Sequence, residues 1–105
     1  MYVVLITYTA PLEEIDYVLA DHSAWIGKQY EAGYFLASGR RDPRTGGVII
    51  TRPMNRDKLN ALLATDPFAL RKFAHYDVIA FTATRTAREL AHFNEAILEN
   101  LERSS

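Results

Sequence analysis

The chain has 105 residues, of which 49% are hydrophobic and 24% are charged, so its size suits one globular domain with its own core. Its 12 Lys and Arg residues balance 13 Asp and Glu residues, and a net charge of -1 supplies no long-range field for a polyanion. We therefore expect no nucleic-acid partner. The absence of cysteine excludes disulfides, thiolate zinc sites, iron–sulfur clusters and cysteine nucleophiles.

The first predicted element is a strand over residues 1–9. This β-branched and aromatic run is apolar on both alternating faces, which is typical of a central strand covered on both sides. It does not resemble a signal peptide, because it lacks a basic start and leads directly into the acidic segment 13–16. No apolar run approaches the roughly 20 residues that cross a bilayer. We expect no membrane contact and a cytoplasmic location.

A helix is predicted after Pro11, because an apolar stripe at helical spacing continues to Gly33, which is the expected C-terminal stop. The stripe consists of Ile15, Val18, Leu19, His22, Ile26 and Tyr30. Trp25 and Gln29 lie at its edge. The stripe predicts which face of the helix packs on the sheet.

Three further strands are predicted over residues 34–38, 48–51 and 75–84. A loop at 39–47 joins the first two, since it is rich in Gly, Pro and Arg. Two short helices precede the last strand. Asn55 is the expected N-cap of the first helix, and Asp66 followed by Pro67 is the expected start of the second.

A final helix is predicted to start at Thr86-Ala-Arg-Glu89, which has the form of a capping box. Its apolar stripe comprises Leu90, Phe93, Ile97 and Leu101. Glu99 and Arg103 form a favourable i, i+4 pair on this helix. We thus predict a domain at 1–84 and a C-terminal helical extension at 85–105.

The predicted order is β-α-β-β-α-β plus a C-terminal helix, an α+β ferredoxin-like arrangement with a four-stranded antiparallel sheet. Helices on one face leave the other face open, yet the first and fourth strands look apolar on both faces. A second copy of the sheet would cover that face, which predicts a face-to-face homodimer forming a dimeric α+β barrel. The alternative is that the C-terminal helix alone covers it.

His22 and Asp66 are the candidate catalytic residues. His22 is the one histidine on the helical stripe, and histidine is the natural proton carrier near neutral pH. A buried structural histidine is the alternative. Asp66 is equally a helix cap, but a capping carboxylate can still hold an imidazole, so the two roles are compatible. We expect a carboxylate oxygen of Asp66 within about 2.6–3.2 Å of an imidazole nitrogen of His22.

Ser38, Arg40 and Trp25 are the candidate substrate-binding residues. Ser38 and Arg40 flank a glycine where a strand enters a loop, and arginine binds an anionic or hydroxylated ligand bidentately. A plain turn with a solvated Arg40 is the alternative, and Trp25 is equally suited to the core. No histidine or carboxylate pair has metal-ligand spacing, and no nucleophile triad is evident. We expect neither a metal nor a cofactor.

Residues 1–84 resemble the YciI-like (YCII-related) domain family, which has a ferredoxin-like α+β fold. The resemblance rests on Tyr8-Thr-Ala-Pro11, His22-Ser-Ala-Trp25 up to Gly33, Phe35-Leu-Ala-Ser-Gly39, Asp66-Pro67-Phe68 and Tyr76-Asp-Val-Ile79 in this order. It implies a dimer with a cleft in which His22 and Asp66 form the catalytic pair. It also implies lyase or dehalogenating chemistry on hydroxylated aromatic rings. The helix predicted from Thr86 onward extends past the usual end of the family's domain.

Three functions remain open from the sequence. The first is a cofactor-independent acid–base enzyme, of lyase or isomerase type, acting on a small ring or enolisable metabolite through the His–Asp pair. The second is a non-catalytic module that binds a small ligand or serves as an accessory protein. The third is a cofactor-free ring monooxygenase. A catalytic pair lines a concave pocket with its histidine partly accessible, whereas a structural pair is fully enclosed.

Overall fold

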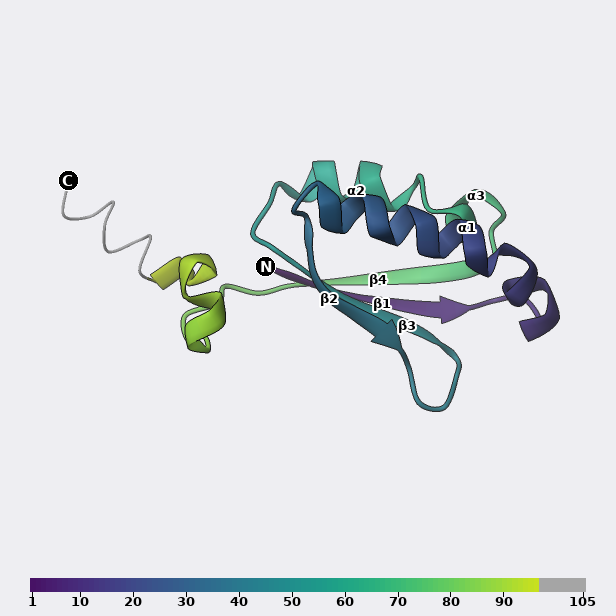
Figure 1. The fold of residues 1–105 in the computed structure, drawn as a ribbon, viewed down its shortest axis with the longest axis horizontal. Coiled ribbons are helices and arrows are strands. Elements are labelled where there is room, and N and C mark those ends of the chain that lie inside the picture. Colours follow the sequence, from purple (N-terminus) through teal and green to yellow (C-terminus); the bar gives the residue numbers. More distant parts are fainter. Residues whose placement is uncertain (97–105) are drawn as a thin grey trace.

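Four strands form one antiparallel sheet in the order β2-β3-β1-β4 in the computed structural model, which describes residues 1–96. The strands are β1 (Tyr2–Tyr8), β2 (Phe35–Arg40), β3 (Gly46–Thr51) and β4 (Ala74–Ala80). The α-helices are α1 (Leu12–Glu31), α2 (Arg56–Leu63) and α3 (Pro67–Leu70). Figure 1 shows all three helices on one face of the sheet. This is the predicted α+β ferredoxin-like fold, and the prediction is confirmed.

The core lies between the helices and one face of the sheet. Val4 of β1 stands opposite Ile49 of β3 and Val78 of β4 in the register of the sheet. Val4 and Ile49 are fully enclosed beneath Leu59 of α2. Because side chains alternate along a strand, this register places the even-numbered residues of β1 under the helices and the odd-numbered ones on the other face.

The other face of the sheet is partly apolar and carries no α-helix (Figure 1). Val3 stands opposite Ile50 and Ile79 across this face, and Ile79 is 49% exposed. On β4, however, His75 and Asp77 share the face with Ile79, and both are exposed. The expectation that the fourth strand is apolar on both faces is therefore wrong, because two of its three residues on this face are polar.

Helix α1 packs on the core through a slightly different stripe from the predicted one. Its buried residues are Ile15, Val18, Trp25 and Gln29, whereas Tyr30 is 39% exposed. The true line runs 15-18-22-25-29, a 3-4-3-4 spacing that places His22 at its centre. Trp25 and Gln29 are thus buried and do not lie at the edge of the contact line.

The β2–β3 hairpin is tighter than predicted. β2 continues to Arg40 and β3 begins at Gly46, so the connecting turn spans only 41–45. A Cβ atom on Gly46 would lie 1.7 Å from the carbonyl oxygen of Ile6, so only glycine allows β3 to approach β1 this closely. Arg40 consequently belongs to the end of a strand and has a fixed position in the sheet register.

The segment after β4 differs from the predicted helix. It forms a 3₁₀ helix, η1 (Arg88–Phe93), whose N-cap is Ala87 without a side-chain cap, so the predicted capping box is wrong. η1 contributes no buried residue, and Asn94 is its C-cap. The remaining residues of the predicted stripe, Ile97 and Leu101, and the pair Glu99–Arg103 lie outside the described residues.

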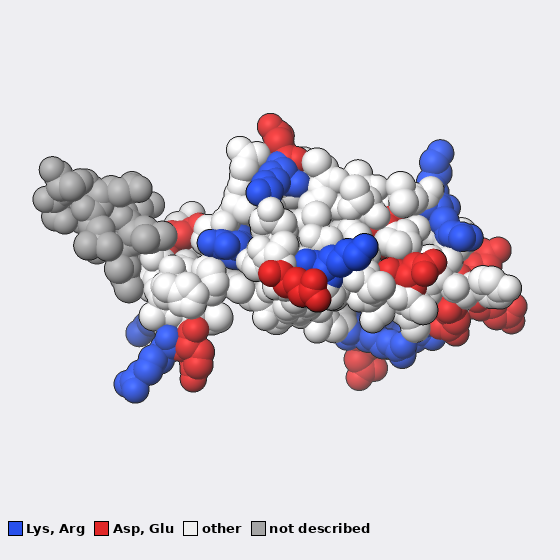
Figure 2. Space-filling view, turned by 45° about the horizontal axis from the view of Figure 1, so that its top comes forward, with Lys and Arg blue, Asp and Glu red and all other residues white. Residues whose placement is uncertain are grey.

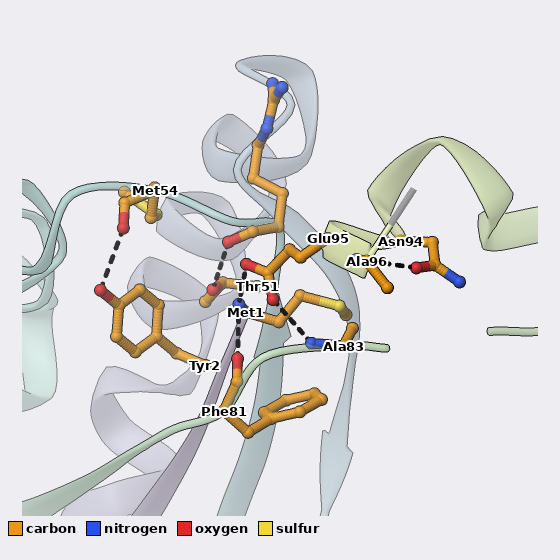
Figure 3. Close-up of polar contacts among 10 residues, drawn as sticks. Met1, Tyr2, Thr51, Met54, Phe81, Ala83, Asn94, Glu95 and Ala96 are labelled. Atoms are coloured by element: carbon orange, nitrogen blue, oxygen red, sulfur yellow. Dashed lines mark hydrogen bonds and ion pairs between the residues drawn. The ribbon is translucent and has the colours of Figure 1, made fainter. Parts of the chain in front are cut away.

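Polar contacts attach this segment to the start of the chain (Figure 3). One carboxylate oxygen of Glu95 lies 3.2 Å from the α-amino group of Met1, and the other accepts the backbone N–H of Ala83 at 2.6 Å. Figure 1 shows η1 beyond the end of the sheet, not against its open face. Within residues 1–96, the helices are too short or too polar to cross a membrane.

Candidate active site

His22 and Asp66 meet between α1 and the start of α3. His22 Nδ1 lies 2.8 Å from Asp66 Oδ1, within the expected hydrogen-bond range. The His22 side chain is 15% exposed, whereas Asp66 is completely enclosed. His22 lies on the face of α1 that packs against the core, so its imidazole reaches α3. The helix break at Asp66 and Pro67 turns the Asp66 carboxylate inward.

Asp66 is both a helix cap and the partner of His22. Its Oδ1 also accepts the backbone N–H of Phe68 at 3.1 Å, which satisfies an amide at the start of α3. Its Oδ2 accepts the phenol of Tyr76 at 2.5 Å. A buried carboxylate is tolerated only with such donors, since an uncompensated charge in the core is strongly unfavourable. Three donors therefore converge on this one side chain.

Tyr76 is a part of the site that our sequence analysis did not assign. It lies on β4 opposite Ile6, so its side chain faces the helices. Burial, and then its hydrogen bond to Asp66, raise the pKa of Tyr76 above its ordinary value near 10. Tyr76 thus remains a protonated donor. Period-two alternation along the predicted strand placed Tyr76 on the same face as Val78, which is the signal that could have identified it.

Aromatic packing fixes the plane of the His22 imidazole. Phe68 stacks on it with ring centroids 4.1 Å apart and planes inclined by 17°, and Trp25 lies at 6.0 Å. With Nδ1 donating to Asp66, the lone pair of the neutral ring resides on Nε2. Within residues 1–96, Nε2 has no hydrogen-bond partner. The ring is therefore held on one side and available to a ligand on the other.

A cavity of about 280 Å³ opens beside His22. Its apolar wall is formed by Ile6, Tyr8, Leu19, Ile26, Val48, Ile49 and Phe68. Its polar wall is formed by His22, Ser23, Ser38, Arg40 and the backbone of Gly39, Gly46 and Gly47. The cavity exists partly because Gly47 stands between Ile6 and Arg40 in the sheet register and has no side chain to fill it. Its size suits a single-ring ligand.

The structure brings most of the candidate residues together. His22, Ser38 and Arg40 line one cavity, and Asp66 stands behind His22. The Ser38 hydroxyl lies 2.7 Å from the phenol oxygen of Tyr30, which holds it at the cavity wall. Trp25 lies outside the cavity lining: its indole N–H donates to Thr65 Oγ1 at 2.9 Å within the core. Ser23, next to His22 in the sequence, lines the cavity and was not assigned.

Among the described residues, the helical side of the molecule shows no concentration of charge of one sign (Figure 2). Charges of both signs are scattered over the helical side of the molecule, with uncharged surface between them (Figure 2). Within residues 1–96, no group of three His, Cys, Asp or Glu side chains is placed to hold a metal ion. The cavity beside His22 is where the candidate residues His22, Ser38 and Arg40 meet.

Comparisons with known proteins agree with this architecture. The model of the YCII-related domain matches residues 1–82. A similar solved structure is 5-chloro-2-hydroxyhydroquinone dehydrochlorinase (TftG) from Burkholderia phenoliruptrix AC1100, in complex with 2,5-dihydroxybenzoquinone. The alignment covers 77% of this chain and 93% of that one, with a TM-score of 0.63 and 17% sequence identity. This similarity shows a shared fold. A search of the curated proteins found no match.

Proposed function

Since the chain belongs to the YCII-related domain family, we propose that it is a small acid–base enzyme, of lyase or isomerase type, acting on a ring or enolisable metabolite. The observation that carries the proposal is the state of His22: Asp66 holds Nδ1, and Nε2 is free of protein partners within residues 1–96 at the wall of a cavity. A purely structural pair would have both ring nitrogens occupied. The accessible Nε2 therefore favours catalysis over the binding-module alternative.

The geometry supports a two-step proton transfer. The lone pair of His22 Nε2 takes a proton from a C–H or O–H bond of the substrate, and the bonding electrons remain on the substrate as an enolate or phenolate. The imidazolium that forms keeps its Nδ1–H on Asp66, whose buried charge stabilises it. The same proton then returns to another substrate atom in an isomerisation, or accompanies a leaving group in an elimination.

The cavity wall supports a ring-type substrate. The aromatic ring of Phe68 stacks on His22 and lines the same cavity, so it extends a flat apolar surface toward the ligand. On the polar wall, Ser38 and Arg40 would hold a substrate oxygen. The solved structure of similar fold is named a dehydrochlorinase and holds 2,5-dihydroxybenzoquinone, which is consistent with this class of ligand.

Isotope exchange tests the proposal directly. A panel of hydroxylated rings and enolisable ketones is incubated with the protein in D₂O, and deuterium incorporation or product formation is followed by mass spectrometry. We expect turnover that falls by about 10²–10⁴-fold in His22→Gln and in Asp66→Asn, because each removes the general base or its partner. His75→Gln is the matched control and leaves the rate unchanged. Ligands that bind without exchange or product would establish a binding module instead.

The proposed assembly is a homodimer formed through the open face of the sheet. The apolar row of Val3, Ile50 and Ile79 lies on that face, opposite the three α-helices (Figure 1). A second copy would cover it by two-fold symmetry. Light scattering should give about twice 11.9 kDa for the natural chain and a shift toward the monomer for Ile79→Glu. A natural chain that is monomeric at micromolar concentration would contradict the dimer.

A further inference from the structure

The charge of the cavity is set by a single arginine. Among the residues that line it, Arg40 carries the formal positive charge, His22 is titratable, and no Asp or Glu side chain is present. Asp66 lies behind His22 and is already bound by three donors. A ligand in this cavity therefore meets the Arg40 guanidinium, which no carboxylate of the lining neutralises, on one wall and an imidazole on the other.

The three arginines of the β2–β3 hairpin differ in their partners. The guanidinium of Arg44 forms an ion pair with Asp16 of α1. Arg41 donates to Thr7 Oγ1 at 3.1 Å. Within residues 1–96, the guanidinium of Arg40 has no hydrogen-bond or ion-pair partner. The hydrogen bond from Arg44 is the main cause of the lowered pKa of Asp16, and the charge of Arg40 adds to it.

The sheet register fixes Arg40 toward the cavity. Arg40 pairs with Gly47, and Gly47 pairs with Ile6, which is buried beneath the helices. Residues paired directly across neighbouring strands project to the same face. Arg40 thus starts on the cavity side of β2, with the empty position of Gly47 between it and the apolar wall.

We propose that the ligand of this cavity is a carboxylate-bearing ring, whose carboxylate is bound by Arg40 while its reactive end faces His22 Nε2. The planar guanidinium fork matches a carboxylate bidentately. One unpaired cation also matches a single negative charge better than the double charge of a phosphate monoester. The inference rests on the proposed function for the role of His22, and it adds the charge of the substrate.

The expected selectivity is large enough to measure with simple probes. We compare para-hydroxybenzoate with para-hydroxybenzamide, which has nearly the same shape without the charge. Binding to the full chain is followed by NMR titration in low-salt buffer. Because hydrogen bonds between charged groups are considerably stronger than neutral ones, the benzoate should bind at least about 10-fold more tightly than the amide.

Two arginine variants separate the local contact from the general field. Arg40→Gln should reduce the benzoate preference to about 1, whereas Arg41→Gln, which removes the same charge outside the cavity lining, should keep it. Thermal melts confirm that both variants fold. Equal binding of the two probes to the natural chain would overturn the inference. The inference would also be overturned if Arg40→Gln kept the benzoate preference, or if Arg41→Gln lost that preference equally. The absence of saturable benzoate binding at about 10 mM would overturn it as well.

A further variant distinguishes this inference from the proposed catalysis. His22→Gln should retain the benzoate preference while losing isotope exchange. Preference without exchange in the natural chain would leave the anion site in place and refute the enzyme. Isotope exchange without a benzoate preference would leave the enzyme in place and refute the anion site.

Discussion

Residues 1–96 contain two His–Asp pairs in different regions, one at the cavity wall and one on the open face of β4. His22 and Asp66 lie 2.8 Å apart, with side chains 15% and 0% exposed. His75 and Asp77 lie 3.1 Å apart, with side chains 65% and 59% exposed. The two pairs thus share residue types and contact distance, and they differ in burial.

Burial decides what else the carboxylate must bind. Asp66 has two further donors, the phenol of Tyr76 and the backbone N–H of Phe68. In the single chain, Asp77 has solvent instead, which screens its attraction to His75. The comparison teaches that a histidine–carboxylate contact is informative about function only when the surroundings keep it dry, orient it and leave a ring nitrogen toward a cavity.

Removing the two carboxylates is the strongest test of this difference. Asp66→Ala should lower the free energy of unfolding by about 2–5 kcal/mol, because it removes a helix cap and leaves the partly buried Tyr76 hydroxyl without its acceptor. Asp77→Ala should change it by less than about 0.5 kcal/mol. Urea unfolding measures both. A similar loss in the two variants would show that burial does not separate the pairs.

Alkaline pH provides a second test through Tyr76. Its pKa is raised in the folded state, so the folded protein keeps the phenol proton at pH values where the unfolded chain loses it. Stability from this group is complete below pH ~10 and falls by about 1.4 kcal/mol per pH unit above it. Tyr76→Phe should remove that slope.

The control for this slope is Tyr17→Phe, since Tyr17 is 91% exposed. Urea unfolding at several pH values between about 9 and 11 would compare the variants. If the free energy of unfolding of Tyr76→Phe falls with alkaline pH as steeply as that of the natural chain, Tyr76 does not hold its proton for Asp66.

The smallest effect is expected at the exposed Arg44–Asp16 pair. The hydrogen bond from Arg44 lowers the pKa of Asp16, so the pair adds stability above the ordinary value of 3.8, and this contribution is lost as pH falls through the lowered pKa. Asp16→Asn should therefore weaken the protein slightly at neutral pH and not at all in strong acid or high salt. A difference that persists in high salt would contradict a purely exposed pair.

Local sequence signals predicted the helices and strands correctly where those elements bury apolar residues. The order of the elements along the chain and the caps at Asn55 and Asp66 follow from alternation and capping chemistry, and the structure has both caps. The capping box at Thr86–Glu89 failed, because η1 buries no apolar residue that would stabilise an α-helix there. The free energy that a helix cap contributes is too small to stabilise a helix without packing.

The His–Asp pair of the candidate site was predictable from the sequence, but only some of the other residues of the site were. His22 and Asp66 could be paired because the two connections of this fold lie on one sheet face. Tyr76 could not be assigned from residue types, since tyrosine is common in strands and its contact with Asp66 depends on the register of β4. Trp25 was expected at the ligand, but a shift of the α1 contact line places it in the core.

Hydrophobic periodicity, proline breaks and caps predict the order of the elements, because they act within a few residues along the chain. Which of the two His–Asp pairs is enclosed, and that Arg40 lines a cavity left open at Gly47, is visible only in the folded chain. The physical reason is that burial and unpaired charge depend on side chains brought together from distant segments. The strand register and the rotation of each helix set those contacts, and neither can be predicted from the sequence of a single segment.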